Sequence, residues 1–81
     1  MLPEKATEAL VHIGKEAVPY LLKKLRALDA NDGGYQYKII AILGRIGKDA
    51  SAAKPDLQNL LQRTTNHDVK YAIEAALQAI E

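Results

Sequence analysis

The chain has 81 residues, of which 48% are hydrophobic, and a formal net charge of +1, so it is long enough for one compact domain and too weakly charged to indicate nucleic-acid binding by itself. Its apolar residues are chiefly Ala, Leu, Ile and Val, which favour helices over sheets. It contains no Cys, which excludes disulfide bonds, thiolate metal sites and a cysteine nucleophile.

Two helices are predicted in the first part of the chain, at about residues 3–13 and 15–28. The apolar residues of the first helix follow helical spacing: Leu2, Ala6, Ala9, Leu10 and Ile13. Gly14 then stands where a left-handed C-terminal cap favours glycine. The second helix opens near Pro19, and its predicted inward stripe consists of Val18, Leu21, Leu22, Leu25 and Leu28.

Three further helices are predicted after the turn at residues 29–34, at about 35–46, 49–63 and 67–80. Gly47 and Pro55 repeat the roles of the earlier glycine and proline, with a longer turn between them. We expect one of Tyr35 and Tyr37 to pack at the helix start and the other to be exposed. The predicted inward residues of the three helices are Tyr35, Ile39, Ile42, Leu43 and Ile46; Leu57, Leu60 and Leu61; and Val69, Ala72, Ile73, Ala76, Leu77 and Ile80.

An internal repeat accompanies this pattern. Residues 9–17, ALVHIGKEA, reappear as ILGRIGKDA at residues 42–50, and a shorter copy, ALQAI, occupies residues 76–80. A helix pair that recurs in this way is typical of stacked helical repeats. We therefore predict a single domain, 1–81, built of repeat units at about 1–32, 33–66 and 67–81.

Residues 42–61, ILGRIGKDASAAKPDLQNLL, followed by Asp68-Val69-Lys70, resemble the short HEAT-like repeat of the phycobilisome-lyase type. The resemblance implies an all-α fold, a right-handed α-α superhelix (a HEAT-like solenoid) with five helices in about two and a half repeats. In such a stack the first helix of each pair lines the convex side, and the second helix lines the concave side.

No group of residues in the sequence indicates catalysis. His12 is expected on the polar side of a helix and His67 in a turn, and no pair of His has the spacing of metal ligands. The carboxylates occur singly and suit helix ends and turns. We therefore predict that the chain is not an enzyme and holds neither cofactor nor metal, although the resemblance leaves open an accessory role in a lyase or a glycosylase.

The second helices offer a candidate surface for protein binding. On a helical wheel, one row of polar side chains on each of them points away from the apolar stripe, and stacking places the two rows side by side. Such a concave strip suits a polar or acidic segment of a partner protein. An ordinary solvated face is the alternative. The predicted protein-binding residues are Tyr20, Lys23, Lys24, Asp56, Asn59 and Arg63.

The sequence leaves two other kinds of partner open, a nucleic acid and a second copy of the chain. Residues 15–54 hold eight Lys and Arg against four Asp and Glu, and this basic region would contact nucleic-acid phosphates if folding gathered it on one side. The helical wheel argues against a single basic surface, because Lys23 and Arg45 belong to different faces. A homo-oligomer through the terminal repeat faces, with Ala75 and Ala79 outward on the last helix, is the other alternative. By default we expect no membrane contact and a cytoplasmic location, because no long apolar run or signal peptide is evident.

Overall fold

The computed structural model describes the backbone from Glu4 and the side chains from Glu8 to the end of the chain, so the predictions for Leu2 and Ala6 lie outside the described side chains. Every regular element in this part is helical, which confirms the all-α class. The α-helices are α1 (Glu4–Ile13), α2 (Val18–Ala27), α3 (Gly33–Ile46), α4 (Lys54–Arg63) and α5 (His67–Ile80). Short 3-10 segments join them: η1 (Gly14–Ala17), η2 (Ala30–Asp32) and η3 (Gly47–Ala53).

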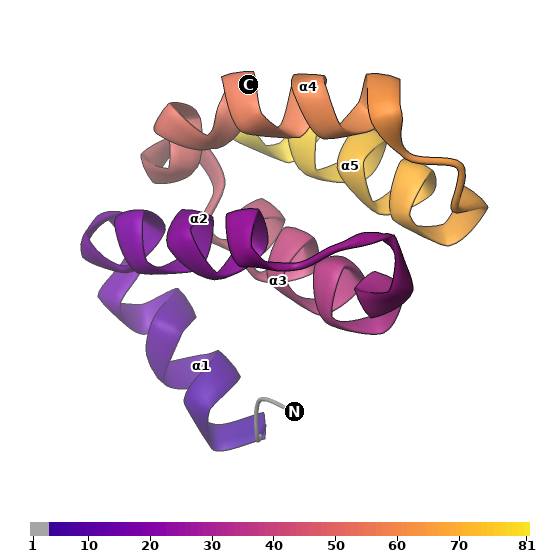
Figure 1. The fold of residues 1–81 in the computed structure, drawn as a ribbon. Helices are drawn as coiled ribbons and strands as arrows, with labels where there is room; N and C mark the ends of the chain where they lie inside the picture. The colour runs from indigo at the N-terminus through magenta and orange to yellow at the C-terminus, as the bar shows by residue number, and fades with distance from the viewer. Residues whose placement is uncertain (1–3) are drawn as a thin grey trace.

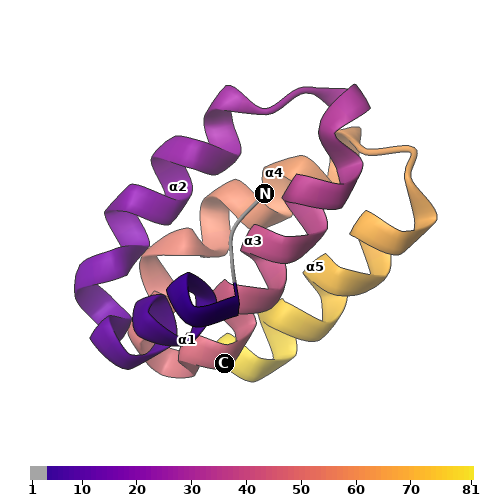
Figure 2. The same cartoon turned by 90° about the horizontal axis from the view of Figure 1, so that it is seen from below.

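The helices form two layers (Figures 1 and 2). Helices α2 and α4 lie in the front layer of Figure 1 and run in the same direction, and α3 and α5 lie behind them. The most extensive helix packing joins α3 to α5, while α1 packs against α3 and η1. Within the described chain, no helix combines the length and apolar character needed to cross a lipid bilayer.

The hydrophobic core lies between these layers and follows most of the predicted stripes. It takes apolar side chains from α2, α3, α4 and α5, and Leu21, Ile40, Leu43, Leu57 and Ile73 are among those fully shielded from solvent. These residues recur three, four or seven positions apart on their helices, which is the spacing that turns one helical face inward. Burial of this face supplies most of the free energy of folding.

Three predictions about apolar residues are wrong. In α1, Ile13 is 52% exposed and Ala9 is also exposed, while only Leu10 and Val11 pack against the core. The reason is that α1 packs mainly against α3 and the adjoining η1 segment, so much of its surface is uncovered. In α3, Tyr35 and Tyr37 are both exposed, at 40% and 43%, because Gln36, which lies between them, is the residue of this turn that points inward.

The turns after α1 and α3 follow the predicted chemistry. Gly14 and Gly47 have φ angles of 65° and 75°, in the region that L side chains rarely adopt. The second and fourth helices begin later than predicted, because each glycine leads first into a 3-10 turn and the α-helix starts only beside Pro19 or Pro55. The turn before Pro55 is the longer of the two, as predicted.

Replacing glycine by alanine should have opposite effects at two positions. Gly47→Ala should lower the free energy of unfolding by about 1–2 kcal/mol, because a Cβ disfavours this positive φ. Gly34→Ala should raise it by about 0.4–1 kcal/mol, since Gly34 is helical and a Cβ there meets nothing within 4 Å. Urea denaturation of the two variants checks both signs. A stabilised Gly47→Ala variant would contradict the turn described here.

Candidate binding cleft

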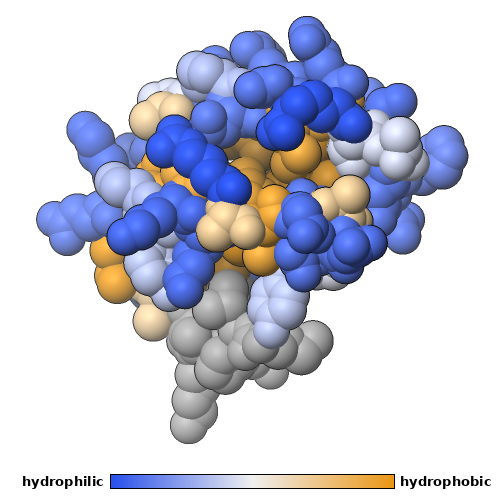
Figure 3. All heavy atoms as spheres, in the orientation of Figure 1, coloured by the Kyte–Doolittle hydropathy of each residue, from blue (hydrophilic) through white to orange (hydrophobic). Residues whose placement is uncertain are grey.

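A cleft of about 400 Å³ separates α2 from α4 and is the main candidate for a functional site. Its walls are the carboxyl-terminal half of α2, the length of α4 from Asp56 to Arg63, and the turns that follow these two helices. In the space-filling view, apolar side chains are visible at the bottom of this hollow and hydrophilic side chains surround it (Figure 3). An apolar floor with a polar rim is the usual composition of a binding site.

The floor of the cleft follows from how the two helices end. Leu25 and Leu60 are core residues of α2 and α4, and their outer sides reach the cleft together with Leu28. Both helices stop at an extended residue, Leu28 with φ −89° and ψ 146°, and Thr64 with φ −75° and ψ 140°. The chain therefore turns away at the same point of each helix, which leaves the space between the helix ends open.

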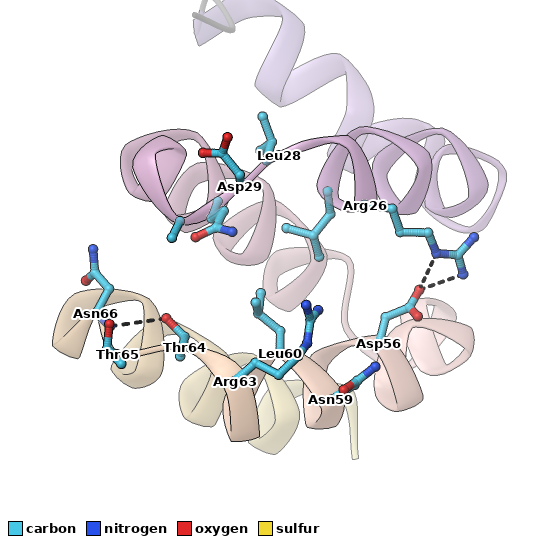
Figure 4. A pocket seen from close by; sticks show the side chains of 13 residues that line it. Arg26, Leu28, Asp29, Asp56, Asn59, Leu60, Arg63, Thr64, Thr65 and Asn66 are labelled. Carbon is cyan, nitrogen blue, oxygen red and sulfur yellow. Dashed lines mark hydrogen bonds and ion pairs between the residues drawn. The ribbon is translucent and has the colours of Figure 1, made fainter.

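An ion pair spans the cleft at one end (Figure 4). The Nε and Nη2 atoms of Arg26 in α2 donate hydrogen bonds to Oδ2 of Asp56 in α4, at 3.1 and 2.7 Å. The side chains are 67% and 27% exposed, so we assign the pair only about 0.2–1 kcal/mol of stability. Its main effect is geometric, because it connects two helices that otherwise touch little.

The polar groups at the other end of the cleft serve the backbone. Oδ1 of Asn66 accepts hydrogen bonds from the backbone N–H groups of Asp68 and Val69, at 2.9 and 3.1 Å, and so caps α5. Oγ1 of Thr64 accepts one from the N–H of Asn66. The Asp29 carboxylate caps η2 and accepts a hydrogen bond from the N–H of Asn31. These hydrogen bonds define the local structure at this end of the cleft.

Four polar side chains of the cleft have no such partner among the described residues: Gln36, Asn59, Arg63 and Thr65. Gln36 is the one buried polar residue of the described side chains, at 5% exposure, and lines the cleft from α3. Across residues 8–81, no hydrogen bond joins its side-chain amide to another residue, and neither Asn59 nor Arg63 has an ion-pair or side-chain hydrogen-bond partner. The structure thus places one neutral amide inside the cleft and one cation on its rim.

The six residues predicted for protein binding divide between two surfaces. Asp56, Asn59 and Arg63 line the cleft. Tyr20 and Lys24 line a separate hollow of about 420 Å³ on the other flank of α2, where the Lys24 Nζ lies 5.6 Å from the centroid of the Tyr20 ring, within the range of a cation–π contact. Lys23 is exposed on α2 and lines neither. The rows of α2 and α4 therefore do not form one continuous strip.

Ten of the thirteen residues that line the cleft were not among the predicted binding residues, and two of these ten, Arg26 and Gln36, carry polar groups that bear on its chemistry. Arg26 forms the ion pair with Asp56 across the cleft. Gln36 carried a sequence signal that could have been used: it precedes Ile40 and Leu43 by four and seven positions, on the same helical face. A polar residue in an otherwise apolar row marks a buried polar group.

A third hollow, of about 280 Å³, lies between α3 and α5. Small residues line most of it, including Gly44, Ala75 and Ala79, and the exposed side chains of Tyr37 and Tyr71 stand beside it. The prediction that Ala75 and Ala79 face outward on the last helix is confirmed by their exposure. Arg45 also lines this groove, so the basic residues of the central region are distributed over different surfaces.

The histidines and the acidic residues are the remaining groups that bear on catalysis or metal binding. His12 and His67 are exposed and belong to different helices, α1 and α5. Among the described residues, no group of three or more His, Asp or Glu is placed to hold a metal ion. Comparisons with protein-family models, curated proteins and solved structures find no match for this chain. The all-helical class and the cleft are therefore the basis on which a function is proposed.

Proposed function

We propose that this chain is a non-catalytic module that binds a segment of a partner protein in the cleft between α2 and α4. The observation that carries the proposal is the cleft itself: it is open, has a leucine floor, and has hydrogen-bonding groups on its rim. Its volume is near the lower end of the range for ligand sites, about 300–1,000 Å³. That size suits a few residues of a peptide segment.

The arrangement of the helix pairs agrees with a HEAT-like solenoid, which we propose as the architecture. Helices α2 and α4 each follow a positive-φ glycine, a 3-10 turn and a proline, and each ends at an extended residue. They lie side by side in the same direction (Figure 1). In a solenoid, equivalent helices form the concave face, where partner segments bind. The proposed cleft would then be part of that face.

Binding of nucleic acid is supported less well than binding of protein. The cleft is lined by two Arg and two Asp, so its formal charges balance. Arg45 lies apart from them, beside the groove between α3 and α5. A phosphate backbone requires several cations along one surface. We therefore expect little affinity for DNA or RNA oligonucleotides.

The proposal is tested by comparing two double variants in an affinity capture experiment. Asn59→Ala with Arg63→Ala removes two exposed rim groups of the cleft, and alanine favours the helix, so folding should be retained. Tyr20→Ala with Lys23→Ala is the matched control, because both residues lie on α2 outside the cleft. Proteins captured by the native chain are quantified by mass spectrometry, and circular dichroism checks helicity.

We expect the native chain and the control variant to capture the same partner protein in equal amounts. The cleft variant should capture about tenfold less of it, because it has lost a charge-assisted contact. Equal capture by all three chains would remove the cleft as the binding site. Loss in the control alone would assign binding to the Tyr20 flank of α2. Salt-dependent capture of nucleic acid would support the alternative.

A further inference from the structure

Gln36 is the buried polar residue of the described side chains. It is 95% buried, yet its amide makes no hydrogen bond to another described residue. All side-chain N and O atoms of the described residues that are fully shielded from solvent do have partners, so the unpaired amide of Gln36 must touch solvent, and the solvent it reaches is that of the cleft. An amide that reaches the cleft and makes no internal hydrogen bond keeps its donor and its acceptor available to a ligand.

A carboxamide matches the main chain of a peptide. It offers a carbonyl oxygen as acceptor and an NH₂ group as donor, which correspond to the N–H and C=O of a peptide group. Among apolar neighbours such as Leu25 and Leu60, these hydrogen bonds would be shielded from water and so strengthened. The position of Gln36 therefore favours an extended peptide over a helix, because the backbone groups of a helix are already paired.

Charge identifies one side chain of that peptide. Asp56 is paired with Arg26, and Asp29 accepts hydrogen bonds from the N–H groups of η2. Arg63 is thus the cleft cation that has no ion-pair partner among the described residues. A guanidinium pairs best with a carboxylate, which it contacts through two parallel hydrogen bonds.

The position of Arg63 in the cleft indicates whether the carboxylate of the peptide is internal or at its end. Figure 4 shows Arg63 between the Arg26–Asp56 pair at one end of the cleft and Thr64, Thr65 and Asn66 at the other. A carboxylate at the end of a chain would leave part of the cleft empty beyond Arg63. An internal acidic residue allows the peptide to continue in both directions.

We propose that the ligand of this cleft is an extended peptide with one internal acidic residue. Its main chain pairs with the amide of Gln36, its carboxylate pairs with Arg63, and its apolar neighbours rest on Leu25, Leu28 and Leu60. This inference rests on the proposed function and narrows the partner to a stretch of acidic and apolar residues in extended conformation.

The probe is a bead library of random octapeptides with acetylated N-termini and amidated C-termini, screened with the fluorescently labelled full chain. Peptides from the brightest beads are made in soluble form, and their Kd values are measured by fluorescence anisotropy. Two variants remove the proposed contacts: Gln36→Met, which keeps side-chain length, and Arg63→Gln, which removes the charge. Their matched controls lie outside the cleft: Gln78→Met on α5 and Arg45→Gln on α3.

Selected peptides should share one Asp or Glu beside apolar residues. Exchanging that acid for its amide should weaken binding about tenfold or more to the native chain and little to the Arg63→Gln variant. Methylating one peptide nitrogen should weaken binding to the native chain and little to the Gln36→Met variant. The melting temperature of Gln36→Met should equal or exceed that of the native chain, because no internal partner is lost, and both controls should bind normally.

The possible failures are distinguishable. Peptides that require Asn59 and Arg63 but show no acidic preference would overturn this inference and leave the proposed function intact. Unchanged affinity of the Gln36→Met variant would overturn the main-chain contact. A library without binders, together with a protein captured through the cleft, would show that the ligand is not a short peptide. A failure of both experiments would overturn the proposed function as well.

Discussion

Replacing Leu43 by Ala should lower the free energy of unfolding by about 2–5 kcal/mol. Leu43 is fully buried in α3, which packs against α1, α2 and α5. The lost methyl groups remove apolar contacts and leave a cavity that helices on several sides cannot all close. An 81-residue chain has a total stability of only about 4–12 kcal/mol, so this single change should leave the native state marginal.

Urea denaturation followed by circular dichroism measures the effect, and Gln78→Ala is the control. Gln78 is exposed on α5, so its truncation should change stability by less than about 0.5 kcal/mol. Ile46, three positions after Leu43, is only partly buried, and its truncation should cost less than that of Leu43. If the midpoints of Leu43→Ala and Gln78→Ala were equal, α3 would not hold the central position described here.

The helices could be predicted from the sequence because the signals that define them are local. Apolar spacing, the glycines at positions 14 and 47 and the prolines at positions 19 and 55 each act within one or two turns of chain. The exposure of Ile13 could not be predicted in this way, because it depends on which neighbours cover α1.

The composition of the cleft was predictable only in part, for a geometric reason. A helical wheel gives the angular position of a side chain but not the direction in which the neighbouring helix lies. In the structure α4 lies beside the flank of α2 that carries Leu25 and Arg26, while Tyr20 and Lys24 lie on the opposite flank, toward the start of α3. The α4 residues of the predicted site, Asp56, Asn59 and Arg63, all line the cleft.

Gly44 should be sensitive to an added side chain. A Cβ at Gly44 would lie 3.2 Å from Cα and 3.3 Å from Cβ of Ala76, so α3 and α5 touch here almost backbone to backbone. Gly44→Val adds two further methyl groups to this contact and should lower the free energy of unfolding by about 3 kcal/mol, the upper part of the range for overpacked cores. Thermal and urea denaturation both measure the loss.

A second substitution separates this close approach from a general effect of valine in a helix. Ala76→Gly removes the Cβ that the new side chain meets but keeps the backbone carbon, so it should restore part of the stability lost by Gly44→Val. Ala75→Gly, at the neighbouring exposed position, has the same effect on helix propensity, about 1 kcal/mol, and should restore nothing. Equal behaviour of the two double variants would mean that α3 and α5 are not in contact at Gly44, because only a direct contact makes the loss at one residue depend on its partner.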